Sequence, residues 1–270
     1  MQITSNAYPF HVENTADTCF FHIIMWSDYF SMPDTFDTMN LFYNRPAWIA
    51  FLLVAFWTIA ANGYSYYMQL KGADVRYVDN IDTFLMALVA LFLFVQKKAG
   101  FPEPLDPKIS NRKRFFIPMA AGIVFGLLDI LIIRVILHPE PYTSLPPFLQ
   151  PFPYSVSLYL NGALYMEIFY RLLPFMLIML PVTKFTPEKF HMPVFLVLAV
   201  ITSLAEPIMQ FPDGALWFRI YATASGFAMN FLQAWYFRKY GFFASLSVRL
   251  GHYLFWHILQ GIYVEQFELP

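Results

Sequence analysis

Long uninterrupted apolar blocks, separated by short polar or proline-containing segments, dominate the sequence after residue 46. An apolar helix of about 20 residues is long enough to cross a hydrocarbon layer of roughly 30 Å. Polar residues and prolines mark the ends of such helices. The pattern predicts an all-α, polytopic transmembrane bundle with about seven spanning helices, at 47–68, 81–96, 115–137, 155–180, 193–211, 215–237 and 242–263.

The segments around these helices divide the chain further. We expect one transmembrane domain at 47–263, a non-spanning or interfacial N-terminal segment at 1–46, and a short tail at 264–270. Within the N-terminal segment, residues 20–30 are candidates to lie along the membrane interface. The proline-rich loop at 138–154 should be extended and stiff, and it suits a lid or a spacer equally well.

The lysine and arginine content of the loops predicts the orientation, because basic loops stay on the cytoplasmic side. The loops after the second, fourth and sixth predicted helices are basic, whereas loops 138–154 and 211–214 and the tail after Tyr263 contain no lysine or arginine. We therefore expect the basic loops in the cytoplasm and the others outside. Lys71 and Arg76 in the first loop do not fit this alternation.

The composition agrees with a membrane protein. Of the 270 residues, 58% are hydrophobic and only 13% are charged, which is too little charge to solvate a globule. The net charge of -1 gives no argument for nucleic acid. The one cysteine, Cys19, excludes an intrachain disulfide and a zinc site built on thiolates. The start of the chain lacks a secretory signal pattern, and with few cysteines this suits a bacterial cytoplasmic (inner) membrane.

Ionisable and amide residues nevertheless interrupt the predicted spans. A charge at the bilayer centre costs roughly 2.5–3.5 kcal/mol on insertion scales, so each one needs a partner, a water pocket or a function. The polar residues inside the spans are Asp129, Arg134, Asn161, Glu167, Arg171, Glu206, Arg219, Asn230, Arg249, His252 and His257.

The spacing of these residues suggests partners for some of them. Glu167 and Arg171 are four apart on one helical face and are able to neutralise each other, either as a structural pair or as part of a site. Asp129 and Arg134 are five apart and should meet other helices. Arg219 lies near a helix end, where its side chain can reach the interface, so we interpret it as structural.

The seventh predicted helix carries two histidines. Arg249, His252 and Trp256 fall on one stripe, whereas His257 is rotated by roughly 140° from His252 in an α-helix. A lone helical histidine is usually a packing residue. Two histidines together with Glu167 and Glu206 nevertheless supply the imidazole and carboxylate groups that a divalent metal such as zinc, or an activated water, requires. The metal candidates are Glu167, Glu206 and His252. Two glycines on the third helix, Gly122 and Gly126, have GxxxG spacing, which allows close approach of a neighbouring helix.

The run LYMEIFYRLLP around Glu167 and Arg171 resembles the first motif of the CPBP family, the type II CAAX prenyl proteases and bacteriocin-processing membrane proteins. The resemblance extends over about 115–263 in layout. It implies a membrane core in which carboxylates and histidines activate water to hydrolyse a peptide bond of a membrane-associated or lipidated substrate. The later family motifs would correspond to ITSLAEP at Glu206 and RLGHYLFWH at His252 or His257.

The sequence departs from this family pattern at three places. Met166 replaces the first glutamate of the family pair, which serves as the base in the family. Glu206 stands where a histidine is expected, and His252 begins HxxxW rather than HxxxN.

Three functions therefore stay open. The first is a divergent intramembrane hydrolase that uses Glu167, Arg171, Glu206, His252 and His257. The second is an inactive relative that binds or scaffolds another membrane protein. The third is a transporter or proton relay.

Overall fold

The computed structural model describes residues 44–269, and within them the chain is helical with no strand. The predicted interfacial stretch at 20–30 and Cys19 lie outside the described residues. The helices are α3 (Arg45–Leu70), α4 (Asn80–Val89), α5 (Ile117–Asp129), α6 (Tyr154–Glu167), α7 (Leu173–Phe185), α8 (His191–Met209), α9 (Leu216–Tyr240), α10 (Phe242–Tyr253) and α11 (Gln260–Phe267).

Short π-helical or 3₁₀ turns join or extend several of these helices. The 3₁₀ turn Ala90–Phe94 extends α4, and π turns flank α5 at Arg112–Phe116 and Ile130–Leu137. The π turn Ile168–Leu172 joins α6 to α7, and Leu254–Leu259 joins α10 to α11. As a result, α6 and α7 form one helical rod, and so do α10 and α11.

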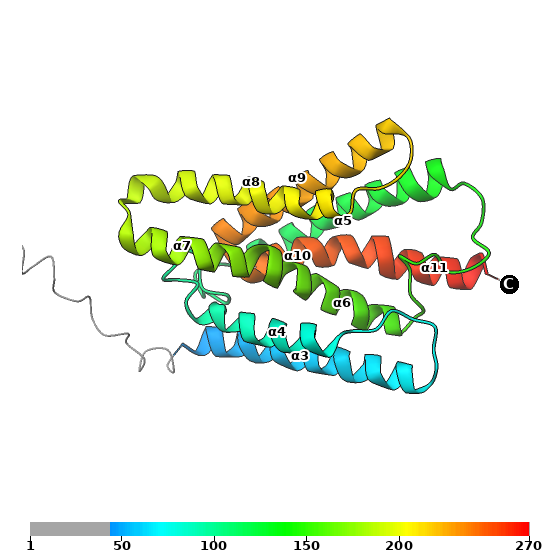
Figure 1. The fold of residues 1–270 in the computed structure, drawn as a ribbon, viewed down its shortest axis with the longest axis horizontal. Coiled ribbons are helices and arrows are strands. Elements are labelled where there is room, and N and C mark those ends of the chain that lie inside the picture. The colour runs from blue at the N-terminus through cyan, green and yellow to red at the C-terminus, as the bar shows by residue number, and fades with distance from the viewer. Residues whose placement is uncertain (1–43, 270) are drawn as a thin grey trace, which may run out of the picture. The chain divides into compact units, whose positions relative to one another are not determined.

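The helical rods run in alternating directions. The α3–α4, α5–α6 and α8–α9 connections and the C-terminus lie at one end of the bundle, here called the loop end, on the right of Figure 1. The basic connections, α4–α5, α7–α8 and α9–α10, lie toward the other end. The loops that the sequence groups by charge are thus also grouped in space.

Four helical stretches are long and apolar enough to cross a membrane: Arg45–Leu70, Arg112–Leu137, Tyr154–Phe185 and Glu188–Met209. Asn80–Phe94 is apolar but shorter. Each of the seven predicted spans corresponds to a helical rod in the described residues. The all-α membrane fold is therefore supported, and four spans meet both length and hydropathy criteria.

Two predicted boundaries are wrong. Pro181 was expected to end the fourth span at residue 180, but it lies inside α7, which continues to Phe185. A proline disrupts a helix less where neighbouring groups satisfy the freed backbone. The last span was predicted to end at residue 263, but α11 continues to Phe267.

The predicted close approach at the GxxxG pair is confirmed. A Cβ added to Gly122 would lie 1.8 Å from the Val248 backbone oxygen, and one added to Gly126 would lie 2.8 Å from that of His252. Gly251 on α10 returns the contact, since its Cβ would lie 2.1 Å from the Met119 oxygen. The backbones of α5 and α10 therefore touch, because no side chain separates them at these positions.

An aromatic cluster anchors the bundle toward its basic end. Phe175 stacks on Phe101 at 5.6 Å between ring centroids and meets Phe195 and Phe237 edge to face at 5.6 and 5.2 Å. All four rings are buried. Gly241, with φ of 83°, makes the tight turn from α9 to α10, so these two helices pack as antiparallel neighbours. This packing positions the polar side chains described below.

Candidate functional site

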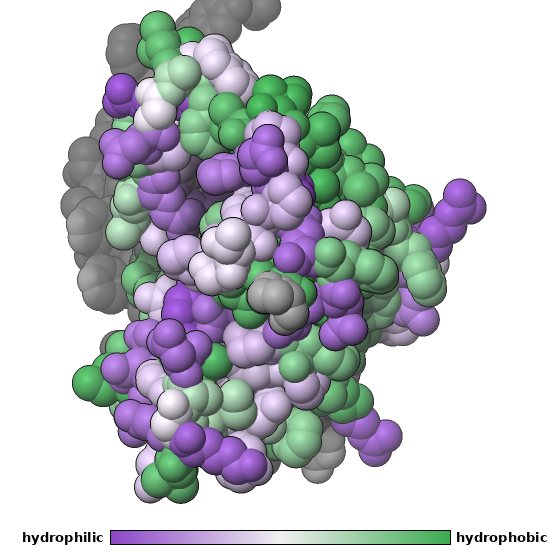
Figure 2. Space-filling view, turned by 90° about the vertical axis from the view of Figure 1, so that its right-hand side faces the viewer, coloured by the Kyte–Doolittle hydropathy of each residue, from purple (hydrophilic) through white to green (hydrophobic). Residues whose placement is uncertain are grey.

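A pocket of about 640 Å³ lies between the helices toward the loop end, which is the side seen in Figure 2. Its walls come from α5, α6, α8, α9, α10, the start of α4 and the loops at 71–79 and 138–153. Hydrophilic side chains spread across the middle of this face of the molecule, with apolar residues along one flank (Figure 2). Drug-sized ligands occupy pockets of roughly 300–1,000 Å³, so the volume suits a small organic molecule.

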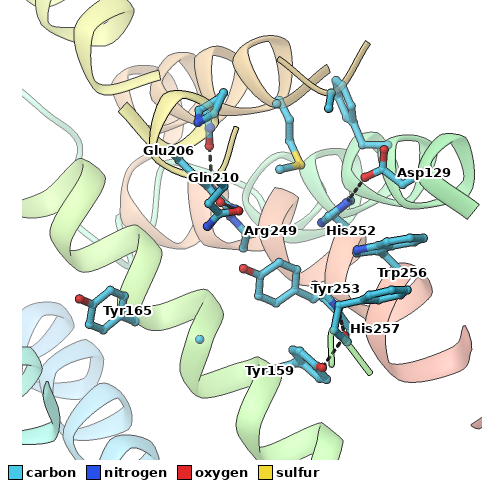
Figure 3. Close-up of a pocket in the computed structure, with 18 of the residues that line it drawn as sticks. Asp129, Tyr159, Tyr165, Glu206, Gln210, Arg249, His252, Tyr253, Trp256 and His257 are labelled. Carbon is cyan, nitrogen blue, oxygen red and sulfur yellow. Dashed lines mark hydrogen bonds and ion pairs between the residues drawn. The ribbon is translucent and has the colours of Figure 1, made fainter. Parts of the chain in front are cut away.

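Glu206 and Arg249 form a bidentate ion pair in the pocket wall (Figure 3). Arg249 Nη1 donates to Glu206 Oε1 at 2.8 Å, and Arg249 Nη2 donates to Glu206 Oε2 at 2.6 Å. Arg249 is 2% exposed and Glu206 is 8% exposed. Both carboxylate oxygens are thus engaged by a guanidinium, which is the strong, directional form of such a pair.

The amide of Asn230 joins two buried arginines. Its Oδ1 accepts from Arg249 Nη2 at 2.7 Å and from Arg171 Nη2 at 2.8 Å. Arg171 also donates to the backbone oxygens of Tyr170 and Asn230 at 2.9 and 3.1 Å. The network links α8, α9, α10 and the α6–α7 rod. It gives hydrogen-bond partners to guanidinium N–H groups that are buried away from water.

Glu167 and Arg171 form no direct ion pair in the described residues, although the two charges still act on each other at longer range. Neither carboxylate oxygen of Glu167 has a hydrogen-bond partner in that part of the chain, and Glu167 and Arg171 lie outside the pocket lining. The π turn Ile168–Leu172 lies between the two residues. A π turn closes hydrogen bonds between residues five apart, so residues four apart no longer stack.

Asp129 joins α5 to α9 and α10. Its Oδ2 lies 2.7 Å from His252 Nε2, and its Oδ1 accepts from the Tyr221 hydroxyl at 2.7 Å. In a neutral His252 this contact places the proton on Nε2 and leaves Nδ1 as a lone-pair acceptor, whereas a protonated His252 would form an ion pair with Asp129. His252 Nδ1 is buried without a hydrogen-bond partner in the described region. Asp129 and Arg134 do meet different elements, as the sequence predicts, since Arg134 pairs with Glu268 at 2.5 Å.

His257 also lines the pocket, although the α-helical period places it away from His252. Its Nδ1 lies 2.8 Å from the backbone oxygen of Phe148, and its ring stacks on Tyr159 at 4.2 Å. His257 lies within the π turn Leu254–Leu259. Because π turns align residues five apart, the predicted rotation of roughly 140° does not hold here.

The proline-rich loop 138–153 is fastened to α11 over the pocket. Glu268 Oε2 accepts from the Tyr142 amide at 2.7 Å, and Glu265 Oε2 accepts from the Phe152 amide at 2.9 Å. Between these points Phe148 lines the pocket and stacks on Trp256 at 5.1 Å. Burial raises the pKa of the Tyr142 phenol. The loop is therefore a fixed wall of the pocket in this conformation.

The proposed metal ligands do not gather into a metal site. In the described part of the chain, no group of three or more histidine, cysteine, aspartate or glutamate side chains could hold a metal ion. The carboxylate of Glu206 is bound by the Arg249 cation, and His252 Nε2 is bound by Asp129. The Arg249 guanidinium already occupies the Glu206 carboxylate and would repel a metal cation there, so the residues present do not fit zinc.

Sequence reasoning found part of this arrangement. Glu206, Arg249 and His252 line one pocket, and so does His257, which the α-helical period had placed on another face. The roles of Tyr221 and Tyr159 were missed, because tyrosines inside apolar helices give no charge signal. The partner of Asp129 was left open. Gly122 and Gly126 predict that a neighbouring helix packs closely against α5, and this is the signal that could have pointed to His252 on α10.

Comparisons with protein-family models, curated proteins and solved structures find no match for this chain.

Proposed function

We propose that this is a seven-span membrane protein that binds a small organic ligand in the pocket at its loop end. On this proposal, the residues that resemble the CPBP motifs hold the helices together. The bidentate pairing of Glu206 with Arg249 carries the argument, at 2.8 and 2.6 Å. A carboxylate with both oxygens held by a guanidinium is a poor general base, because its charge is already compensated.

The seven-span topology is supported by the alternating helical rods and by the basic connections at one end (Figure 1). The α9 helix and the α10–α11 rod are less apolar than the four long candidates. The buried Arg249 of α10 makes its hydrogen bonds within the bundle, which is how charges are accommodated in membrane spans. A lipid bilayer is the surrounding partner under this proposal, and the bacterial inner membrane stays a prediction.

A pocket-filling variant tests the binding function. Ala222 lines the pocket on α9, and Ala224 on the same helix is exposed and outside the lining. We expect native mass spectrometry of protein released from its own membrane to show a small-molecule adduct in the wild type. The adduct should disappear in Ala222→Phe and persist in the matched control Ala224→Phe. An adduct of equal occupancy in both variants contradicts binding in this pocket.

A hydrolase is the second candidate, and one observation favours it. His252 Nδ1 is unpartnered, His252 lines the pocket, and its Nε2 is oriented by Asp129 at 2.7 Å. A carboxylate-oriented imidazole is the arrangement of a general base that activates water. In this alternative the substrate stays the predicted membrane-associated or lipidated peptide. Cleavage of fluorogenic peptides by the purified protein, lost in His252→Gln, would move the assignment to this candidate. The third hypothesis, transport, stays a prediction.

A further inference from the structure

The charges that line the pocket are not balanced. The acidic lining residues are Asp79, Asp82, Asp129 and Glu206, and the arginines are Arg76 and Arg249. Glu206 and Arg249 neutralise each other. With neutral histidines, the remaining lining has three carboxylates and one guanidinium.

Asp129 is the one of these three carboxylates that lies in a helix long and apolar enough to cross a membrane. Its side chain is 20% exposed, and its partners in the described residues are the Tyr221 hydroxyl and the His252 imidazole. The Tyr221 hydroxyl is a neutral donor, and His252 is a neutral donor when its imidazole is unprotonated. An anion inside a membrane span normally faces a cation, because its desolvation is otherwise uncompensated.

Two buried acceptor atoms of the lining also have no donor. Asn161 Oδ1 on α6 and His252 Nδ1 on α10 are both unpartnered in the described part of the chain. Each of these residues is 6% exposed. Buried polar atoms are normally hydrogen-bonded, so these two acceptors indicate a ligand that brings N–H or O–H donors.

Aromatic rings complete the lining. Tyr165, Tyr253, Phe125 and Phe218 come from four different helices and all line the pocket. The faces of such rings attract organic cations and also pack against apolar groups. Arg76 at the loop side is engaged with Tyr159, donating to its hydroxyl at 3.0 Å.

We propose that the ligand is an organic ammonium ion with an apolar body, whose N–H groups donate to the unpartnered acceptors of the lining, Asn161 Oδ1 and His252 Nδ1. This proposal rests on the binding function proposed above. It names the class of molecule that supplies positive charge, hydrogen-bond donors and apolar surface together.

Three compounds that share a phenylalkyl group but differ in the charge of their polar group test the proposed ligand class. They are 4-phenylbutylammonium, 4-phenylbutanol and 4-phenylbutyrate. Isothermal titration of the full chain in nanodiscs, corrected with empty nanodiscs, should show the amine binding at least about tenfold tighter than the alcohol. The carboxylate should bind weakest. Equal or tighter binding of the alcohol overturns the ammonium assignment while leaving the pocket function intact. If 4-phenylbutyrate binds tightest, the ammonium assignment is also overturned, because that result would mean that His252 is protonated and positively charged. Binding of none of the three counts against the proposed function itself.

Substitutions in the lining distinguish a loss of ligand recognition from a loss of folding. Asp129→Asn should weaken the amine by roughly tenfold and leave the alcohol unchanged, whereas Asn161→Leu removes an acceptor that either compound can use and should weaken both. Ser155 is a matched control, since its hydroxyl is also buried and unpartnered but lies outside the pocket lining. Ser155→Ala should leave both affinities unchanged. Asp82→Asn, at the half-buried rim, gives a second charge test if Asp129→Asn fails to fold. Unchanged amine affinity in every folded charge variant contradicts the proposal.

Discussion

Arg249 on α10 holds both carboxylate oxygens of Glu206 on α8, 43 positions earlier in the chain. The two side chains are buried together between helices that no local sequence pattern connects. The pair therefore fixes the position of α10 relative to α8, and it places the pocket beside a neutralised charge pair.

Removing one member of this pair should destabilise the protein more than removing both. Glu206→Leu leaves the Arg249 cation buried without its carboxylate, which typically costs about 3–5 kcal/mol. The double variant Glu206→Leu/Arg249→Leu should recover much of that loss, because no uncompensated charge remains. Unfolding followed in detergent by tryptophan fluorescence measures both changes. A double variant as unstable as the single variant would show that the pair does not stabilise by charge compensation.

The α5–α10 contact should be intolerant of a single methyl group. Gly122→Ala places a Cβ 1.8 Å from the Val248 oxygen, so the helices must separate. We expect a loss of about 2 kcal/mol or more, since overpacking in a tight interface typically costs about 1–3 kcal/mol. Gly63→Ala on α3 is the control, because nothing lies within 4 Å of its added Cβ. Equal melting temperatures for the two variants would contradict the backbone contact.

Cysteine labelling should show both sides of the predicted topology. In a Cys19→Ser background, Ser144→Cys and Asp213→Cys lie in the loops without lysine or arginine, and Lys184→Cys lies at the basic end. An impermeant maleimide should label the first two in intact cells and the third only after permeabilisation, because basic connections stay in the cytoplasm. Labelling of all three in intact cells would overturn the orientation.

The carboxylates near the C-terminus should control the stiffness of loop 138–153. Glu268→Gln weakens the charge-assisted bond to the Tyr142 amide and the pair with Arg134. Bonds to charged groups contribute about 1.5–3 kcal/mol, so exchange at that amide should rise by about tenfold or more. Hydrogen exchange with mass spectrometry measures this. Glu140→Gln, an exposed residue in the same loop, should leave exchange unchanged, and equal protection in both variants would refute the fastening.

The amino-acid sequence by itself determined where the helices lie and which polar residues they bury. Apolar runs specify helix positions because each segment must satisfy its own backbone hydrogen bonds, and Gly122 and Gly126 announced a close contact. The tertiary structure decided which buried groups meet. Arg171 contacts Asn230, and His257 faces the pocket. Both residues lie in π turns, which change the angle between successive side chains around the helix. Glu206 met Arg249, and Asp129 met His252, because partners on different helices are chosen by packing between helices rather than by spacing along one of them.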